Sequence, residues 1–327
     1  MSPRLSHCLL PLATVTDSFA TDPVIAEAHR AALRSIRRVV EETAEPMAPG
    51  VALKKVAEQL QRGGVLVVTG AGVSTDSGIP DYRGPAGSLT RHRPMTYQEF
   101  LHHPGARKRY WARSFVGWRH MDRAAPNSTH YAIAELEHEG MVNGVITQNV
   151  DGLHREAGTR QIVELHGTLD QVTCLDCGAR EDRHEFDERL EALNPGYIES
   201  IGLDPSMVNP DGDVTLPDAA IARFTMATCL RCDSERLKPG VVYFGEPVPA
   251  ERKQRCDALV EQCTSVLVAG SSLAVMSGYR PVLSAMKQGK HVSVINGGPG
   301  RADTKVDVLW RTGVGPAFGE LLDAVGL

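Results

Sequence analysis

The sequence predicts an α/β fold in which a doubly wound, mostly parallel sheet carries two insertions, a small cysteine-rich module and a helical segment. Apolar, β-branched runs recur along the chain, and each ends in a glycine or polar signal. Helical stretches lie between them, and this alternation is typical of a parallel sheet. Two Cys-x-x-Cys pairs bracket a stretch rich in Asn-Pro turns, which predicts a separate module. The predicted strands cover residues 65–69, 144–147, 162–165, 265–269 and 291–295, and the clearest helices cover 130–139 and 250–262.

Composition places the chain among ordinary globular proteins. It has 327 residues, of which 42% are apolar and 23% are charged, close to the averages for soluble domains. The net charge of −5 argues against a direct nucleic-acid partner, and no apolar run approaches the length of a membrane span. No export signal stands out, so we expect a cytoplasmic, bacterial protein, and we favour a monomer.

The chain divides into an N-terminal extension and a main domain. We expect residues 1–50 to be disordered or partly helical, with a helix over 24–45 that Pro46 ends, and to be dispensable. Residues 51–327 form the main domain. Its Rossmann-like part is assigned to 51–84, 126–169 and 241–327, its helical lid to 85–125 and its zinc-binding module to 170–240.

The run Val65–Thr69 ends abruptly in Gly70-Ala71-Gly72, a pattern that indicates a nucleotide site. Glycines here allow a tight turn and a close approach of backbone N–H groups to a phosphate. The polar residues at 74–77 offer caps for a following helix, whose N-terminus favours an anion. An ordinary tight turn remains the alternative, and the next glycine, Gly78, falls outside the G-x-G-x-x-G spacing.

Other predicted strands end in residues suited to holding a dinucleotide. Gln148, Asn149 and Asp151 could hold ribose hydroxyls and a carboxamide, or form an ordinary Asx turn. Asn296 follows a strand at the point where dinucleotide folds place the group that contacts the adenosine ribose. His166, at another strand end beside a glycine, is either a general base or a structural histidine.

Two cysteine pairs predict a structural zinc site. Four thiolates in two knuckles complete a tetrahedron and leave no open position for catalysis. A redox dithiol and two disulfides are the alternatives, and both are disfavoured in a reducing compartment. Cys8, Cys256 and Cys263 lack such partners. The proposed ligands are Cys174, Cys177, Cys229 and Cys232.

Taken together, these positions resemble the sirtuin family over roughly residues 52–325, and they fall in the family's order. The matching segments are Gly70–Arg83, Thr147–Asp151, His166-Gly167, the four cysteines, Lys238–Glu246, Gly270–Leu273 and Asn296. The Asp-Tyr-Arg-Gly ending of the first segment and the long spacer between the knuckles resemble class II, the branch that includes an animal mitochondrial sirtuin.

The resemblance implies an NAD-dependent protein lysine deacylase that spends NAD as a reagent. The acyl-lysine carbonyl attacks the nicotinamide ribose, nicotinamide leaves, and His166 acts as general base on the route to O-acyl-ADP-ribose. It implies His166 and Asn149 as catalytic residues and Val241, Val242, Phe244 and Gly245 as the edge for an acyl-lysine protein substrate. The implied NAD contacts are Gly70, Ala71, Gly72, Ser74, Ser77, Ile79, Asp81, Tyr82, Arg83, Gln148, Asn149, Asp151, His166, Gly270, Ser271, Ser272, Asn296, Gly297 and Gly313.

Several activities stay open within and beside this interpretation. A protein ADP-ribosyltransferase and a deacylase for non-acetyl groups use the same site, whereas an NAD-sensing module or a zinc-ribbon nucleic-acid binder does no chemistry. Tyr110 and Arg113 have the spacing of an acid-binding acyl pair, but Trp111 and Ser114 stand where the pair is expected. The basic residues 91–93 could favour an acidic or bulky acyl chain.

Overall fold

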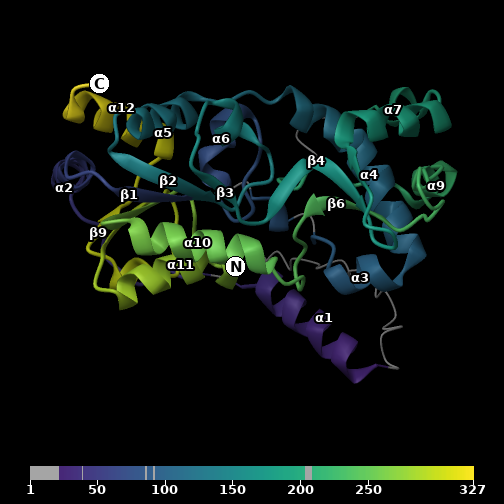
Figure 1. Ribbon diagram of the computed structural model, residues 1–327, viewed down its shortest axis with the longest axis horizontal. Coiled ribbons are helices and arrows are strands. Elements are labelled where there is room, and N and C mark those ends of the chain that lie inside the picture. The colour runs from purple at the N-terminus through teal and green to yellow at the C-terminus, as the bar shows by residue number, and fades with distance from the viewer. Residues whose placement is uncertain (1–21, 39, 85–86, 91–92, 203–207) are drawn as a thin grey trace, which may run out of the picture.

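A computed structural model describes residues 22–38, 40–84, 87–90, 93–202 and 208–327. Its larger sheet has six parallel strands in the order β3-β2-β1-β7-β8-β9 (Figure 1). This doubly wound order reverses between β1 and β7, and such a switch point is where α/β sheets bind ligands. The strands are β1 (Val65–Thr69), β2 (Val142–Thr147), β3 (Ile162–Glu164), β7 (Ser265–Ala269), β8 (His291–Ile295) and β9 (Val308–Trp310). The predicted parallel sheet is confirmed, although β9 carries no clear signal in the sequence.

Helices cover both faces of this sheet (Figure 1). One face packs against α2 (Pro49–Gln61), α5 (Ser128–His138) and α12 (Val314–Val325), and the other packs against α10 (Ala250–Gln262) and α11 (Met276–Lys287). All five residues of β1 and of β7 are buried, which explains why both strands read as continuous apolar runs. No helix in the described part of the chain is long and apolar enough to cross a membrane.

The two insertions form one module around one hydrophobic core. Trp111 and Phe115 from the helical insertion pack with Phe186 and Phe224 from the zinc module, and Cys174 belongs to the same cluster. The expected lid is therefore the central helix of the small module. Its elements are the antiparallel strands β4 (Gly167–Cys174), β5 (Arg180–Asp182) and β6 (Leu237–Val241), with α3 (Tyr97–His102), α4 (Pro104–Arg123), α7 (Arg183–Leu193), α8 (Tyr197–Ile201) and α9 (Asp218–Arg223).

The glycine turn after β1 does not lead into the helix that the sequence predicts. Two short 3₁₀ turns, at Ala71–Val73 and Thr75–Ser77, follow Gly70 instead. Gly78 then adopts a left-handed conformation (φ +83°), and Pro80 has no N–H to donate. A regular helix cannot pass through these two residues. The anion-favouring helix N-terminus at this position is therefore absent.

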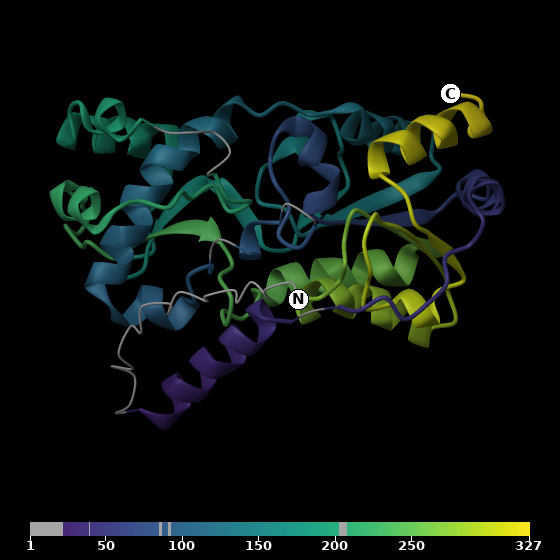
Figure 2. The ribbon, with the colours of Figure 1, turned by 180° about the vertical axis from the view of Figure 1, so that it is seen from behind.

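The N-terminal helix α1 (Pro23–Ile36) is shorter than predicted and is docked onto the small module. It ends at Ile36 rather than at Pro46. His29 Nδ1 lies 2.9 Å from Thr96 Oγ1, and Ala32 Cβ lies against Gly245. The chain then runs back across the main domain to α2 (Figure 2). The part of the extension that the structure describes thus contains a helix, and this helix packs against the rest of the molecule.

The return from α1 to α2 is also tied to the sheet. Glu42 pairs with Arg311 at 2.6 Å, and the Met47 N–H donates to the carbonyl of Leu309, in β9, at 2.8 Å. These contacts lie between the two helices, so they fix where the extension crosses the main domain. The described residues before α2 thus contact both the small module and the larger sheet.

Removing residues 1–46 should lower the melting temperature by about 2–4 °C, because the deletion exposes the buried Thr96 and removes the contact between Ala32 and Gly245. Deleting only residues 1–21, which leaves α1 intact, is the matched control and should leave the melting temperature unchanged. Calorimetry of both truncations checks this, and equal melting temperatures would show that α1 adds no stability.

Candidate functional site

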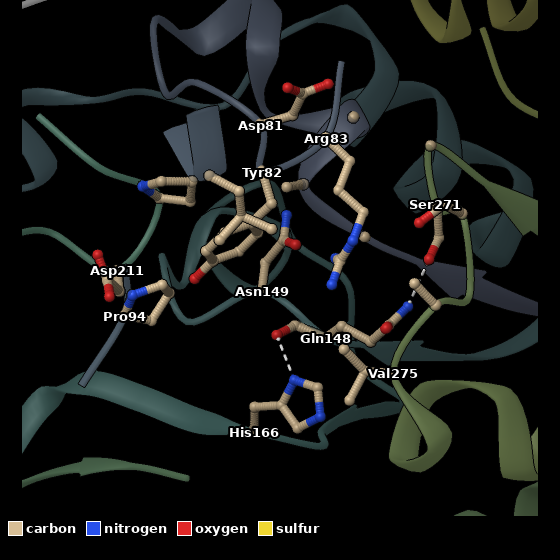
Figure 3. A pocket seen from close by; sticks show the side chains of 18 of the residues that line it. Asp81, Tyr82, Arg83, Pro94, Gln148, Asn149, His166, Asp211, Ser271 and Val275 are labelled. Atoms are coloured by element: carbon tan, nitrogen blue, oxygen red, sulfur yellow. Dashed lines mark hydrogen bonds between the residues drawn. The ribbon is translucent and has the colours of Figure 1, made fainter. Parts of the chain in front are cut away.

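A cavity of about 1340 Å³ lies between the carboxyl ends of the strands and the small module (Figure 3). Typical small-molecule sites measure about 300–1,000 Å³, so this one has room for more than a single small ligand. Of the residues predicted for NAD and peptide, all but one line it. The exception is Ser77, whose hydroxyl accepts a hydrogen bond from Asn127 Nδ2 at 2.9 Å, at the start of α5.

The glycines after β1 allow this turn to pack closely against the turn after β7. A methyl group on Gly72 would lie 2.8 Å from Gly270 Cα, and one on Gly70 would lie 2.8 Å from Ser271 Cβ. The Gly72 N–H also donates to the Gly270 carbonyl at 2.9 Å. The turns that follow β1 and β7 are thus interlocked backbone to backbone. Together they form the floor of the cavity.

His166 is held in one orientation at the cavity wall. Its Nδ1 lies 3.0 Å from the Gln148 carbonyl, which can only accept, so Nδ1 carries the proton (Figure 3). Its Nε2 therefore has a lone pair, and the Ser277 hydroxyl lies 2.7 Å away. Burial, with a smaller effect from Arg252, lowers the pKa of His166 to about 4. The imidazole is neutral at pH 7 and able to accept a proton.

A hydrogen-bonded chain links the residues that follow β2. Asn149 Nδ2 donates to the Ser74 hydroxyl at 2.9 Å, and that hydroxyl donates to Asp151 at 2.7 Å. Burial raises the pKa of Asp151 despite these hydrogen bonds. Gln148 behaves differently, because its amide donates to the Thr69 carbonyl and to Ser271. It braces the strand ends.

Two features of the cavity fit the anionic part of a dinucleotide. Arg83 Nη2 is buried without a hydrogen-bond partner among the described residues, and Figure 3 shows the side chain extended between Asn149 and Ser271. The first residues of α12, which follow Gly313, also line the cavity, and a helix N-terminus favours an anion. Arg83 and this helix end would hold the phosphates of NAD, while Asn296 and Gly297 line the same cavity.

The predicted peptide edge is shaped by a buried ion pair. Lys238 Nζ lies 3.1 Å from Glu246, and Glu246 also accepts from the Tyr243 N–H at 2.9 Å. The backbone of Phe244 is held by α3, because its carbonyl accepts a hydrogen bond from the Tyr97 N–H at 2.9 Å. The whole segment 241–246 lines the cavity.

The four cysteines of the two knuckles converge as predicted. Their sulfur atoms all lie within 4.8 Å of one another, and the pairs Cys174–Cys232 and Cys177–Cys229 are each 3.6 Å apart. Tetrahedral zinc with bonds of about 2.3 Å places sulfurs about 3.8 Å apart, whereas a disulfide needs about 2.05 Å. The geometry fits a structural zinc ion.

Most of the candidate acyl-binding side chains form ion pairs with other residues or are buried in the small module. Tyr110 lines the cavity, but Arg113 pairs with Asp213 at 3.3 Å. Trp111 and Ser114 are buried in the small module. Arg91 and His92 lie outside the described residues, while Arg93 lines the cavity and pairs with Glu99 at 2.6 Å.

The structure adds lining residues that the sequence did not single out. Asp211 comes from a segment that the sequence predicts to be a turn but does not assign to the site. Pro94 comes from the helical insertion, and Leu33 and Ile36 come from α1. The Asn-Pro-Asp-Gly pattern marks the turn, but nothing in it says that the turn faces the cavity. Only the packing of the small module places it there.

Comparison with known proteins decides the family. Residues 70–277 match the sequence profile of the Sir2 family. The chain belongs to the Sir2 family. It is 64% identical over 281 residues to NAD-dependent protein deacetylase 1 of Corynebacterium efficiens, covering 86% of this chain and 100% of that protein. It is 43% identical over 267 residues to NAD-dependent protein deacylase Sirt4 of Drosophila melanogaster, covering 81% and 84%.

Solved sirtuin structures share the fold. One, from work on the structural basis for the mechanism and regulation of Sir2 enzymes, is 32% identical, with a TM-score of 0.67 over 84% of this chain and 98% of the other. A Sir2–p53 peptide–NAD⁺ structure is 26% identical, with a TM-score of 0.64 over 84% and 98%. Helix α1 of this sirtuin lies outside the segment that matches the family profile.

We expect one tightly held zinc ion per chain, and its removal should unfold the small module. Because Trp111 shares a core with Cys174, chelation should shift tryptophan fluorescence to longer wavelength. Metal analysis and fluorescence check this. The variant Cys256→Ser lies outside the cluster and should keep the metal. Absence of bound zinc, or an unchanged spectrum after chelation, would contradict the assignment.

Two buried histidines beneath the site should make the fold sensitive to acid. The rings of His130 and His154 are 4.7 Å apart, and burial lowers their pKa values to about 4 and about 3. The unfolded chain accepts these protons below about pH 6.5. The stability they contribute is therefore complete above that pH and is lost as the pH falls toward their folded values.

His154→Gln, which can keep a polar contact to Thr69, should remove part of this dependence. Between pH 6.5 and 5 the wild-type protein should lose about 2 kcal/mol more unfolding free energy than the variant, at about 1.4 kcal/mol per pH unit. Denaturant unfolding at several pH values measures the difference. Parallel curves would mean that His154 does not stay neutral in the folded protein.

Proposed function

We propose that this sirtuin is an NAD-dependent protein lysine deacylase, with acetyl as the default acyl group. The observation that carries the proposal is the state of His166. Its Nδ1–H is fixed by the Gln148 carbonyl, so the neutral Nε2 is the basic atom at the cavity wall. A base in that position can take a proton from a ribose hydroxyl.

Bound NAD would supply an electrophilic ribose carbon, nicotinamide as leaving group and ADP-ribose as acyl acceptor. The residues of this chain would bind and orient it. Arg83 and the start of α12 suit its phosphates, and the Ser74 hydroxyl fixes Asn149 and Asp151 beneath the ribose. Ser277 would yield its contact with His166 Nε2 when substrate arrives.

An acyl-lysine protein would enter beside segment 241–245. This segment continues from the end of β6 at Val241 and lines the cavity, and peptides commonly bind at a sheet edge by adding a strand. Two solved relatives contain a p53 peptide and a myristoylated histone peptide, which supports a peptide substrate. We further propose a cytoplasmic location, because a zinc site made of four cysteines suits a reducing compartment.

The test is His166→Ala, assayed for the steady-state release of free lysine and O-acetyl-ADP-ribose from NAD and an acetyl-lysine peptide. Loss of the base should lower release by about 10²–10⁴-fold, while calorimetry should show that NAD still binds. His184→Ala, at an exposed histidine of the small module, is the matched control and should retain activity. Undiminished release in His166→Ala would sink the assignment.

Mass spectrometry of the products separates the proposed reaction from its alternative. A deacylase yields O-acyl-ADP-ribose and free lysine, whereas an ADP-ribosyltransferase leaves ADP-ribose attached to protein. Attached ADP-ribose without free lysine would overturn the proposal in favour of transfer, and binding of NAD without any turnover would favour a sensing module.

A further inference from the structure

A rigid turn from the small module reaches into the cavity at the end away from the dinucleotide. Figure 3 shows Asp211 beside Pro94, on the side of the pocket opposite Ser271, with Asn149 and Tyr82 between. Ser271 belongs to the turn after β7, on which the dinucleotide would lie. Asp211 is therefore at the opposite end of the pocket from the dinucleotide. The acyl chain of a bound lysine would extend toward this end.

The turn is held by several independent contacts. The Asn209 N–H donates to the Asp213 carbonyl at 2.8 Å, and Asn209 Nδ2 donates to the Asp213 carboxylate at 2.7 Å. Arg113 from α4 pairs with the same carboxylate. Arg113, whose spacing from Tyr110 suggested an acid-binding pair, therefore anchors the turn. It does not line the cavity.

A glycine on α4 lets the turn sit close. Gly212 has a positive φ of +72°, and a methyl group on Gly117 would lie only 2.5 Å from the Gly212 carbonyl oxygen. Any larger residue at 117 would push the turn outward. The position of Asp211 is thus fixed from both sides of the turn.

One carboxyl oxygen of Asp211 is unpaired in the described part of the chain. Its Oδ1 atom is buried and has no hydrogen-bond partner among the described residues. Burial first, and the nearby Asp213 second, raise the pKa of Asp211 well above its usual range. A raised pKa favours the protonated carboxyl, which can donate a hydrogen bond as well as accept one. Leaving such a group buried and unpaired costs about 1–3 kcal/mol.

The rest of this end of the cavity is aromatic and apolar. Tyr82, Tyr110 and Tyr243 line the cavity and interact electrostatically with Asp211, and Met95 lines the same cavity. Among the described cations, Arg113 behind the turn is already paired with Asp213, and Arg93, which lines the cavity, is already paired with Glu99. An acidic acyl group would therefore meet the Asp211 carboxyl and cations that already have carboxylate partners, whereas a neutral oxygen would meet a hydrogen-bond donor.

We propose that Asp211 hydrogen-bonds an oxygen atom of the acyl chain, so that this sirtuin favours neutral, oxygen-bearing acyl-lysines over plain alkyl chains of the same length and over succinyl-lysine. The inference rests on the proposed deacylase function for the identity of the ligand. It makes Asp211 a specificity-determining residue.

The experiment compares the affinity and the turnover of matched peptides. The pairs are 3-hydroxybutyryl- against butyryl-lysine and 4-oxopentanoyl- against pentanoyl-lysine, with succinyl-lysine as the acidic probe. A hydrogen bond worth about 1 kcal/mol predicts about a fivefold preference for at least one oxygenated member. Affinity is measured by calorimetry without NAD, so the answer does not depend on catalysis.

Three variants of the full chain test the cause. Asp211→Asn keeps a donor and should keep the preference, whereas Asp211→Leu should abolish or reverse it. Gly117→Ala keeps the aspartate at position 211 but should push its turn outward, so this variant should also lose the preference. Folding of each variant is checked by its melting temperature and zinc content.

The outcomes separate this inference from the proposed function. No preference in the wild-type protein, or the same preference in Asp211→Leu, overturns the role of Asp211 even if every peptide is deacylated. A preference in binding that Asp211→Leu removes, without any nicotinamide release, supports the role of Asp211 while the deacylase assignment fails.

Discussion

The interlocking of the turns after β1 and β7 is the constraint on which the rest of the site depends. The two backbones meet at Gly72 and Gly270, where a single methyl group would force them apart. This contact sets the floor of the cavity at the point where the strand order reverses. Gln148 then bridges the same two turns from β2 through Thr69 and Ser271. Three strand ends are thereby fixed as one surface, on which a dinucleotide can lie.

The small module supplies the other wall, and its parts come from distant stretches of chain. Zinc knuckles, α4 and α7 share one core, within which Arg183 is fully buried, stacked 4.7 Å from the Trp118 ring and paired with Asp187 at 3.2 Å. A buried cation needs such partners, because removing it from water is costly. This shared core makes the wall rigid, and the wall carries both the peptide segment and the turn of Asp211.

Several residues make contacts in the structure that differ from the roles predicted for them. Arg113 has the spacing of an acyl-binding residue but is an anchor for Asp213, and Gln148 has the chemistry of a ribose ligand but braces the strands. Ser77 turns away from the cavity toward Asn127. In each case the sequence fixes the hydrogen-bonding groups of the side chain. The partner that satisfies them comes from another part of the chain.

The sequence by itself determined the parallel sheet, the four-cysteine cluster and the strand-end position of His166, because continuous apolar runs, Cys-x-x-Cys spacing and glycine turns are local signals. It did not determine β9, the docking of α1 or the entry of Asp211 into the cavity. Those features depend on which surfaces meet after the chain has folded, and that choice is made by long-range packing. The missing helix after Gly72 has a local cause instead, because the left-handed Gly78 and the following Pro80 outweigh the capping residues.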